Sequence, residues 1–446
     1  MRIGEFAKRV THSSENEKIV LFVTAVVIVV LVVDMELSNV ADIIRRSIVT
    51  EEGVITFVII SMIYLSGQYL IVRFAKAKTI GVSSRKTELR FINLVVSIVQ
   101  GIIISIFILV ILEILLLQYY GLAALIMVLT ISNGLTVWVM LILSKRLYSY
   151  YKSNHERSIL LYLLSGIIIA VTAVVTICFM VPILDSKPDI ITPLIPVILP
   201  SITPGSTLDI LNFAYYILAI ISFLSVWVAT ANLLYTYSKK LGKTKYWILV
   251  SLPLIFYVSQ ILFAAVRVPS LGNLDPVAFI FYYRIIFTVS SSVGGILFAQ
   301  PFIQISRIIP NSNRMHHHLI ILGLGSALFF VSGSATVYHT PFPPFGLATV
   351  ALTGFSAYLM FLGLYSSSVS LSEDSKLRKQ IKRSAQDWKF FLKLSDAEVE
   401  NRIMEQIKGV KYSMTTDTGI APSISVEEAK DYLKEVLTEI KREQGN

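Results

Sequence analysis

Two charged residues stand inside otherwise apolar segments, where an ionisable side chain is costly and usually has a partner. Arg284 lies in the run Phe281-Tyr-Tyr-Arg-Ile-Ile-Phe287, and Glu113 lies in Ile111-Leu-Glu-Ile114. Counted from the ends of their segments, the two lie at similar depth near the outer surface. We therefore predict an intramembrane ion pair that fixes helix packing. A ligand- or ion-responsive pair, and an Arg284 that snorkels to the surface, are the alternatives.

A second group of residues could form a ligand mouth where predicted outer loops meet. His339 precedes the rigid corner Pro341-Phe-Pro-Pro-Phe-Gly346, so its ring could join the aromatic rings of that corner. A solvated loop histidine is the alternative. The predicted mouth consists of His339, Phe342, Phe345, Asp185, Asp209 and Arg267.

Three consecutive histidines, His316, His317 and His318, precede a predicted membrane span. On a helix three consecutive imidazole rings point in different directions. No Cys, Asp or Glu is near them in the sequence to complete a metal-ligand set. We expect a polar collar beside the membrane, and we predict no metal site and no cofactor.

Catalytic templates are missing from the chain. It has no Gly-rich phosphate loop, no His-Glu-x-x-His and no Gly-x-Ser-x-Gly sequence. This disfavours an enzyme.

Composition sets the fold class that must position these residues. Hydrophobic residues make up 54% of the 446 residues and charged residues 15%, against about a quarter charged in soluble chains. The single cysteine, Cys178, excludes an intrachain disulfide. Asp34-Met-Glu36 follows the first apolar run instead of a small-residue cleavage site, so we expect an uncleaved first span.

Ten apolar segments are long enough to cross a hydrocarbon core of about 30 Å as helices. We therefore predict an all-α polytopic membrane bundle of about ten helices, with a short helical cytoplasmic tail. The predicted spans are residues 19–33, 54–72, 91–117, 122–144, 159–184, 210–237, 246–266, 278–302, 319–337 and 347–365.

The distribution of Lys and Arg predicts the orientation, because cytoplasmic loops retain these residues. The odd-numbered gaps between spans hold only Arg45, Arg46, Lys187 and Arg267, whereas the N-terminus and the even-numbered gaps hold twenty basic residues. Both termini are thus predicted to be cytoplasmic in a cell-membrane protein. The net charge of +10 is explained by this topology and by anionic lipid of the inner leaflet, so we predict no nucleic-acid partner.

We divide the chain into a transmembrane domain, residues 1–370, and a cytoplasmic tail, residues 371–446. Ser395-Asp-Ala-Glu398 and Ser425-Val-Glu-Glu428 match the capping box that starts helices. The first predicted tail helix therefore begins near Ser395 and ends near Gly409. Neither tail helix can bury its apolar face alone. We therefore expect each to pack on the bundle, on the other tail helix or on a cytoplasmic protein partner.

The last two spans carry a resemblance. The run Pro341-Phe-Pro-Pro-Phe-Gly-Leu-Ala-Thr349, with Tyr365-Ser-Ser and Asp374-Ser-Lys-Leu-Arg378, resembles a family of uncharacterised archaeal multi-span membrane proteins. Some members of that family are similar to the membrane parts of sensory proteins. The resemblance covers about the last third of the chain and implies no catalytic residue.

Four functional hypotheses remain open, and a membrane enzyme is the least favoured of them. The first is a sensor or signalling subunit that couples outer loops to the tail. Its candidate joint is Ser366-Ser-Ser368, where a continuous helix could transmit motion and a broken one could not. The second is a secondary transporter, whose polar path would pass Glu113, Arg284, Asn133 and Gln260. The third is a structural subunit of a larger membrane complex.

Overall fold

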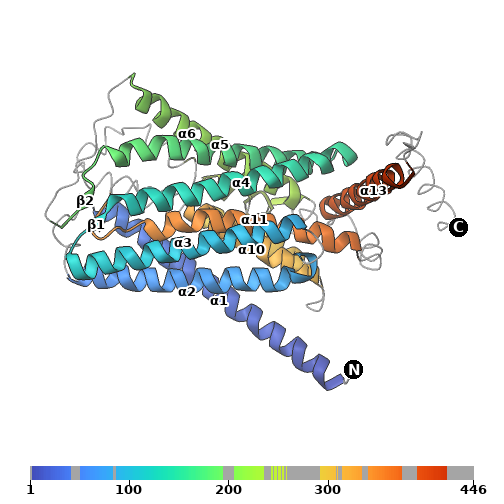
Figure 1. Ribbon diagram of the computed structural model, residues 1–446, viewed down its shortest axis with the longest axis horizontal. Helices are drawn as coiled ribbons and strands as arrows, with labels where there is room; N and C mark the ends of the chain where they lie inside the picture. Colours follow the sequence, from blue (N-terminus) through green and yellow to red (C-terminus); the bar gives the residue numbers. More distant parts are fainter. Residues whose placement is uncertain are drawn as a thin grey trace.

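The computed structural model is an all-α bundle in which long apolar helices run side by side (Figure 1). It describes residues 3–41, 51–83, 87–193, 205–235, 292–307, 314–333, 340–373 and 389–418, a few further residues between 243 and 258, and Ile309. The elements of known bounds are α1 (Ile3–Ala41), α2 (Glu51–Ser83), α3 (Thr87–Leu117), β1 (Tyr120–Gly121), α4 (Leu122–Asn154), α5 (Arg157–Asp185), β2 (Ile190–Ile191), α6 (Thr207–Tyr235), α10 (Arg314–Ser332), α11 (Leu347–Glu373) and α13 (Lys389–Thr418).

Within the described residues, eight helices are long and apolar enough to cross a membrane: α1 to α6, α10 and α11. Even the shortest, α10, has 19 residues, which gives a length of about 28 Å at 1.5 Å per residue. Six carry large apolar side chains on exposed faces, as lipid-facing helices do, for example Phe22 of α1 and Leu116 of α3. The chain is therefore a multi-pass membrane protein, and eight of the predicted spans are confirmed as helices. Most of the seventh and eighth predicted spans, 246–266 and 278–302, lies outside the described residues, so the total of ten stays a prediction.

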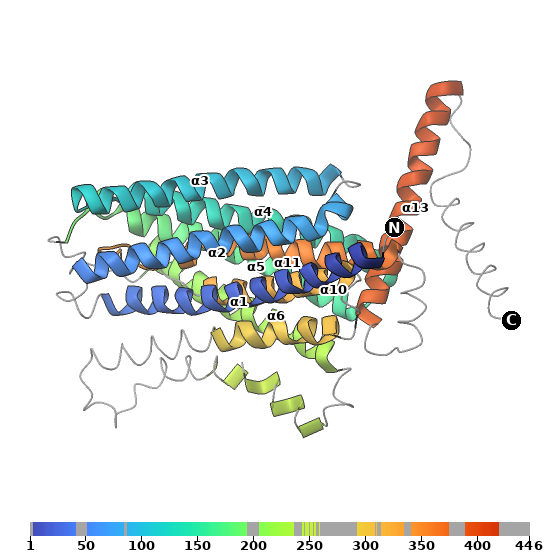
Figure 2. The same ribbon diagram turned by 90° about the horizontal axis from the view of Figure 1, so that it is seen from below.

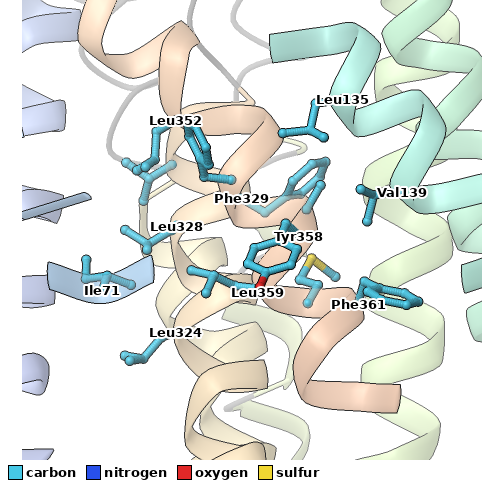
Figure 3. Close-up of a cluster of buried hydrophobic side chains, with 14 of the residues drawn as sticks. Ile71, Leu135, Val139, Leu324, Leu328, Phe329, Leu352, Tyr358, Leu359 and Phe361 are labelled. Atoms are coloured by element: carbon cyan, nitrogen blue, oxygen red, sulfur yellow. The ribbon is translucent and has the colours of Figure 1, made fainter. Parts of the chain in front are cut away.

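The centre of the bundle is formed by α10 and α11. The most apolar 18-residue stretch is wholly buried in these two helices, whereas it is 28 to 50% buried in the other six. Helix α11 contacts α1, α2, α3, α4, α10 and α13. Figure 3 shows how Phe329 of α10 and Tyr358 of α11 lie between the neighbouring helices, beside Leu135 and Val139 of α4.

Close approach of α11 to its neighbours depends on glycine. A Cβ built on Gly363 would lie 2.5 Å from the Leu322 amide nitrogen of α10, and one on Gly354 would lie 2.6 Å from the Ser132 carbonyl oxygen of α4. Both distances are shorter than a side chain tolerates. Small residues at these crossings thus let the backbones pack tightly, as is common between membrane helices.

The two ends of the bundle differ. The corner end, named after the corner Pro341–Gly346, also holds β1 and β2, which pair antiparallel and join the α3–α4 turn to the chain after α5. The tail end, at the opposite side in Figure 1, is where α13 lies, next to the end of α11. Figure 2 shows α13 turned away from the direction of the other helices.

Candidate functional site

The buried polar contacts along α11 begin at the corner end with Asp34 of α1. The Asp34 carboxylate is fully buried and accepts three hydrogen bonds from the start of α11. The donors are the Gly346 amide at 2.9 Å, the Thr349 amide at 3.1 Å and the Thr349 hydroxyl at 2.8 Å. A carboxylate in this position satisfies the free amides of the helix N-terminus and complements its dipole.

The backbone enters α11 through Gly346, whose φ of 91° is unfavourable for residues with a Cβ. This turn directs the Gly346 amide toward Asp34. The two phenylalanines of the corner are packed on either side: Phe342 stacks on Tyr120 of β1, and Phe345 meets Phe57 of α2 edge to face. The corner therefore holds the start of α11 in a fixed position relative to α1, α2 and β1.

One turn further along α11, a side chain of α4 reaches the α11 backbone. The Ser132 hydroxyl donates to the Val350 carbonyl at 2.8 Å and accepts from the Gly354 amide at 3.0 Å. In a regular α-helix this carbonyl and this amide form one rung of the ladder. Insertion of a polar group at such a rung is a known cause of helix bending. Ser132 therefore couples the position of α4 to the backbone geometry of α11.

A cavity of about 130 Å³ lies beside this rung, between α4, α5, α6, α10 and α11. Its size is close to that of cavities of about 150 Å³ that hold a benzene-sized molecule. The apolar part of the wall consists of the aromatic rings of Tyr215, Phe223, Phe329 and Phe330 together with the smaller Ile169, Ala173 and Ala219. The polar part is Asn133, Thr136, Thr172, Thr176, Ser222 and Thr353, and none of the lining side chains is charged.

Most of these polar side chains already donate hydrogen bonds to backbone carbonyls of their own helices. The hydroxyls of Thr136, Thr172 and Thr176 donate to carbonyls four residues earlier, at 2.8 to 3.0 Å. The Asn133 amide nitrogen donates to the Leu129 carbonyl. The lone pairs of these hydroxyls remain as acceptors. The cavity therefore suits a small uncharged molecule with an apolar body and hydrogen-bond donors.

At the tail end, α13 is packed against both α4 and α11. The Tyr150 hydroxyl of α4 donates to the Glu398 carboxyl of α13 at 2.7 Å and lies 3.4 Å from the Ser368 hydroxyl of α11. Arg402 of α13 donates to the Ser372 hydroxyl of α11 at 3.0 Å. Phe391, Leu394 and Ala397 are fully buried in the apolar core. Thus α13 bridges the same two helices that Ser132 joins next to the cavity.

The serine run predicted as a joint lies inside a continuous helix. Ser366, Ser367 and Ser368 are fully buried, and α11 continues through them to Glu373. The hydroxyls of Ser367 and Ser368 donate to carbonyls three residues earlier, so they need no break in the backbone.

The predicted ion pair is only half described. Glu113 lies near the end of α3, and its carboxylate accepts a hydrogen bond from the Gly121 amide at 2.9 Å. Arg284 and Gln260 lie outside the described residues, so the pairing stays a prediction. Of the residues on the predicted transport path, Asn133 lines the cavity.

Four of the six residues in the predicted ligand mouth belong to the described part of the structure. Phe342 and Phe345 are buried in the ring contacts of the corner. Asp185 is exposed at the end of α5, and Asp209 accepts a hydrogen bond from the Gly205 amide at 2.9 Å. His339 and Arg267 lie outside the described residues. The mouth therefore stays a prediction, whereas the cavity beside Ser132 is a site that sequence reasoning missed.

The three histidines are buried, and two of them share a carboxylate partner. His318 lies 3.1 Å from the Ser370 hydroxyl of α11. His316 and His317 both face Glu17 of α1, at 3.1 Å and 3.2 Å. The expectation that no acidic residue lies near them is therefore wrong. The sequence did not reveal Glu17 because it lies 299 residues before His316 in the chain.

The first tail helix is longer than predicted. It begins at Lys389 and continues past Gly409 to Thr418, so Ser395 is an interior residue and caps nothing. The Glu398 carboxyl accepts a hydrogen bond from Tyr150 of α4. Packing on the bundle overrides the local capping signal here. The second predicted tail helix lies outside the described residues.

Comparison with known proteins found no match among protein-family models, curated proteins or solved structures. The resemblance of the last third to an archaeal membrane family therefore stays a prediction.

Proposed function

We infer that this chain is a membrane sensor or signalling subunit that binds a small uncharged molecule in the cavity and transmits the change to α13. In this proposal the protein lies in the cell membrane with both termini in the cytoplasm. The single observation that carries it is the double connection between α4 and α11. Ser132 joins them beside the cavity, and α13 touches both at the tail end.

The mechanism follows from these contacts. A ligand between α4, α5 and α6 displaces α4 relative to α11 only if it binds one arrangement better than the other. Ser132 would convert that displacement into a change at one rung of α11. Because α11 is tightly packed and continuous, the change reaches Ser368 and Ser372, which contact Tyr150 and Arg402. The tail then presents a different surface to a cytoplasmic protein.

A test begins with the ligand. Native mass spectrometry of the protein from mild detergent should detect one small bound molecule, and Ala173→Phe should remove it, because Ala173 is buried in the cavity wall. Val171→Phe is the matched control, since Val171 lies two residues away on α5 and is 44% exposed. Equal retention in both variants would contradict the assignment of the site.

A second test addresses the output. Deletion of residues 371–446 should abolish capture of cytoplasmic partners, whereas Tyr148→Phe on the exposed face of α4 should leave capture unchanged. Identical partners with and without the tail would rule out signalling through it.

A secondary transporter is the second candidate, favoured by the polar lining of the same cavity. It predicts solute flux in proteoliposomes that is lost in Ala173→Phe and survives deletion of the tail. The sensor hypothesis predicts no solute flux in the parent, in Ala173→Phe or in the protein without its tail.

A further inference from the structure

A cluster of one carboxylate and two imidazoles lies at the tail end, apart from the cavity. Glu17 comes from α1, and His316 and His317 come from the first turn of α10. The potential ligand atoms of the three residues all lie within 4.8 Å of one another. Their side chains are 5 to 14% exposed, so the cluster is largely shielded from water.

The tautomer of His316 is fixed by its backbone partner. Its Nδ1 lies 2.7 Å from the Ser306 carbonyl oxygen, which only accepts, so Nδ1 carries a hydrogen. In the neutral ring Nε2 then presents a lone pair toward Glu17 Oε1, 3.1 Å away. Two acceptors that face each other need a proton or a cation between them. An imidazole whose other nitrogen donates to a carbonyl is the usual arrangement of a metal-binding histidine.

A second observation concerns the other side of the carboxylate. Glu17 Oε2 and His317 Nδ1 are both buried and face each other as a close pair 3.2 Å apart, but neither makes a well-oriented hydrogen bond with the described residues. Buried polar atoms without a well-formed hydrogen bond are uncommon, and an ion bound between these two would satisfy both. Ligands at about 2.0 to 2.2 Å from a tetrahedral metal lie about 3.4 Å from each other. The separations in the cluster, 3.1 and 3.2 Å, are close to this value.

We propose that Glu17, His316 and His317 bind a divalent transition-metal ion of the zinc class. Imidazole nitrogen with a carboxylate oxygen suits Zn²⁺ far better than Mg²⁺ or Ca²⁺, which prefer oxygen ligands. The bound ion would tie α1 to α10, and through the Ser306 carbonyl to helical residues 292–307. Three protein ligands leave the remaining position for water.

Lys78 of α2 opposes the ion. Its Nζ lies 3.4 Å from His317 Nε2, on the side of the ring away from Glu17. If Nδ1 binds the metal, Nε2 carries the hydrogen, and an ammonium group then faces an N–H donor. The lysine side chain must move when the metal binds, and its charge weakens the site. Removal of that charge should therefore strengthen metal binding.

The test uses the full-length chain, purified without a polyhistidine tag and stripped of metal with a chelator. Titration with Zn²⁺ should show about one ion per chain, and Co²⁺ should give the intense visible absorption of a tetrahedral site. Glu17→Gln, His316→Gln and His317→Gln should each weaken binding by more than the 10- to 100-fold that loss of an outer partner causes. Lys78→Gln should tighten it. His155→Asn, at the left-handed residue that ends α4, is the histidine control and should bind as the parent does.

Two results would overturn the proposal. One is a parent protein that folds normally and binds no Zn²⁺, in which case His316 and Glu17 form a protonated ion pair only. The other is equal binding by the parent and by both His316→Gln and His317→Gln. Because the parent alone decides the first result, poor folding of a variant leaves the proposal testable.

Discussion

The carboxylate of Asp34 on α1 caps the amide of Gly346 at the start of α11, across 312 residues of sequence, and the two atoms are 2.9 Å apart. This contact fixes one end of the most buried helix of the bundle. The other end of α11 is held by Arg402 and, through Ser368, by Tyr150. The helix is thus anchored at both ends, and the Ser132 rung lies between the anchors.

Replacement of Asp34 should destabilise the bundle strongly. Asp34→Ala removes the acceptor of the buried Gly346 and Thr349 amides, and each unsatisfied amide costs about 1–3 kcal/mol. The Thr349 hydroxyl keeps the Leu31 carbonyl as an acceptor, at 3.2 Å. Asp34→Asn keeps one oxygen acceptor and should lose less. Thermal unfolding in one detergent should rank the parent first, then Asp34→Asn, then Asp34→Ala. Asp185→Ala, at an exposed carboxylate, should behave as the parent, and the account of the cap is wrong if Asp34→Ala does too.

Loss of the Tyr150 hydroxyl should loosen α13 without unfolding the bundle. Tyr150→Phe removes the hydrogen bond to Glu398, a contact of about 1–3 kcal/mol. We expect faster protease cleavage within α13 and little change in the melting of the membrane helices. Tyr148→Phe alters the same helix at a residue that is 60% exposed, so cleavage should stay at the parent rate. Equal cleavage of the two variants would show that this hydrogen bond does not hold α13.

The close contact between α10 and α11 should not tolerate a methyl group. In Gly363→Ala the new Cβ would meet the Leu322 backbone, so the helices must separate, at a cost of about 1–3 kcal/mol. Gly101→Ala on α3 is the matched control, because no atom lies within 4 Å of its Cβ position. We expect a lower melting temperature for Gly363→Ala and an unchanged or higher one for Gly101→Ala. The reverse order would contradict the packing described for α11.

The helices could be predicted from the sequence because the length of an apolar run is a local property. Six outer helices and the two central ones all met the same length criterion. The same criterion does not distinguish the lipid-facing helices from the central pair, because a helix becomes central through its packing against other helices. The small residues of Leu347–Tyr365, such as Gly354 and Gly363, favour close helix packing, but they do not by themselves indicate that the span is wholly enclosed.

The polar contacts could not be predicted because their partners are remote in sequence. Asp34 was interpreted only as evidence against a cleavage site, since its partners Gly346 and Thr349 are more than 300 residues away. Glu398 matched a local capping motif, yet its acceptor role is toward α4. The histidines lacked a nearby acid for the same reason. A buried polar residue inside an apolar run signals that a partner exists, but not which residue it is.

Amide hydrogen exchange of α13 in cavity-filled variants tests the central claim most directly. Ala173→Phe fills the cavity from its α5 wall and should change exchange of the α13 amides severalfold, whereas Val171→Phe, which faces outward, should not. Ser132→Ala should suppress the effect of Ala173→Phe, because it removes the contact between α4 and the Val350 and Gly354 backbone. Unchanged exchange of α13 in a folded Ala173→Phe protein would contradict coupling between the cavity and the tail.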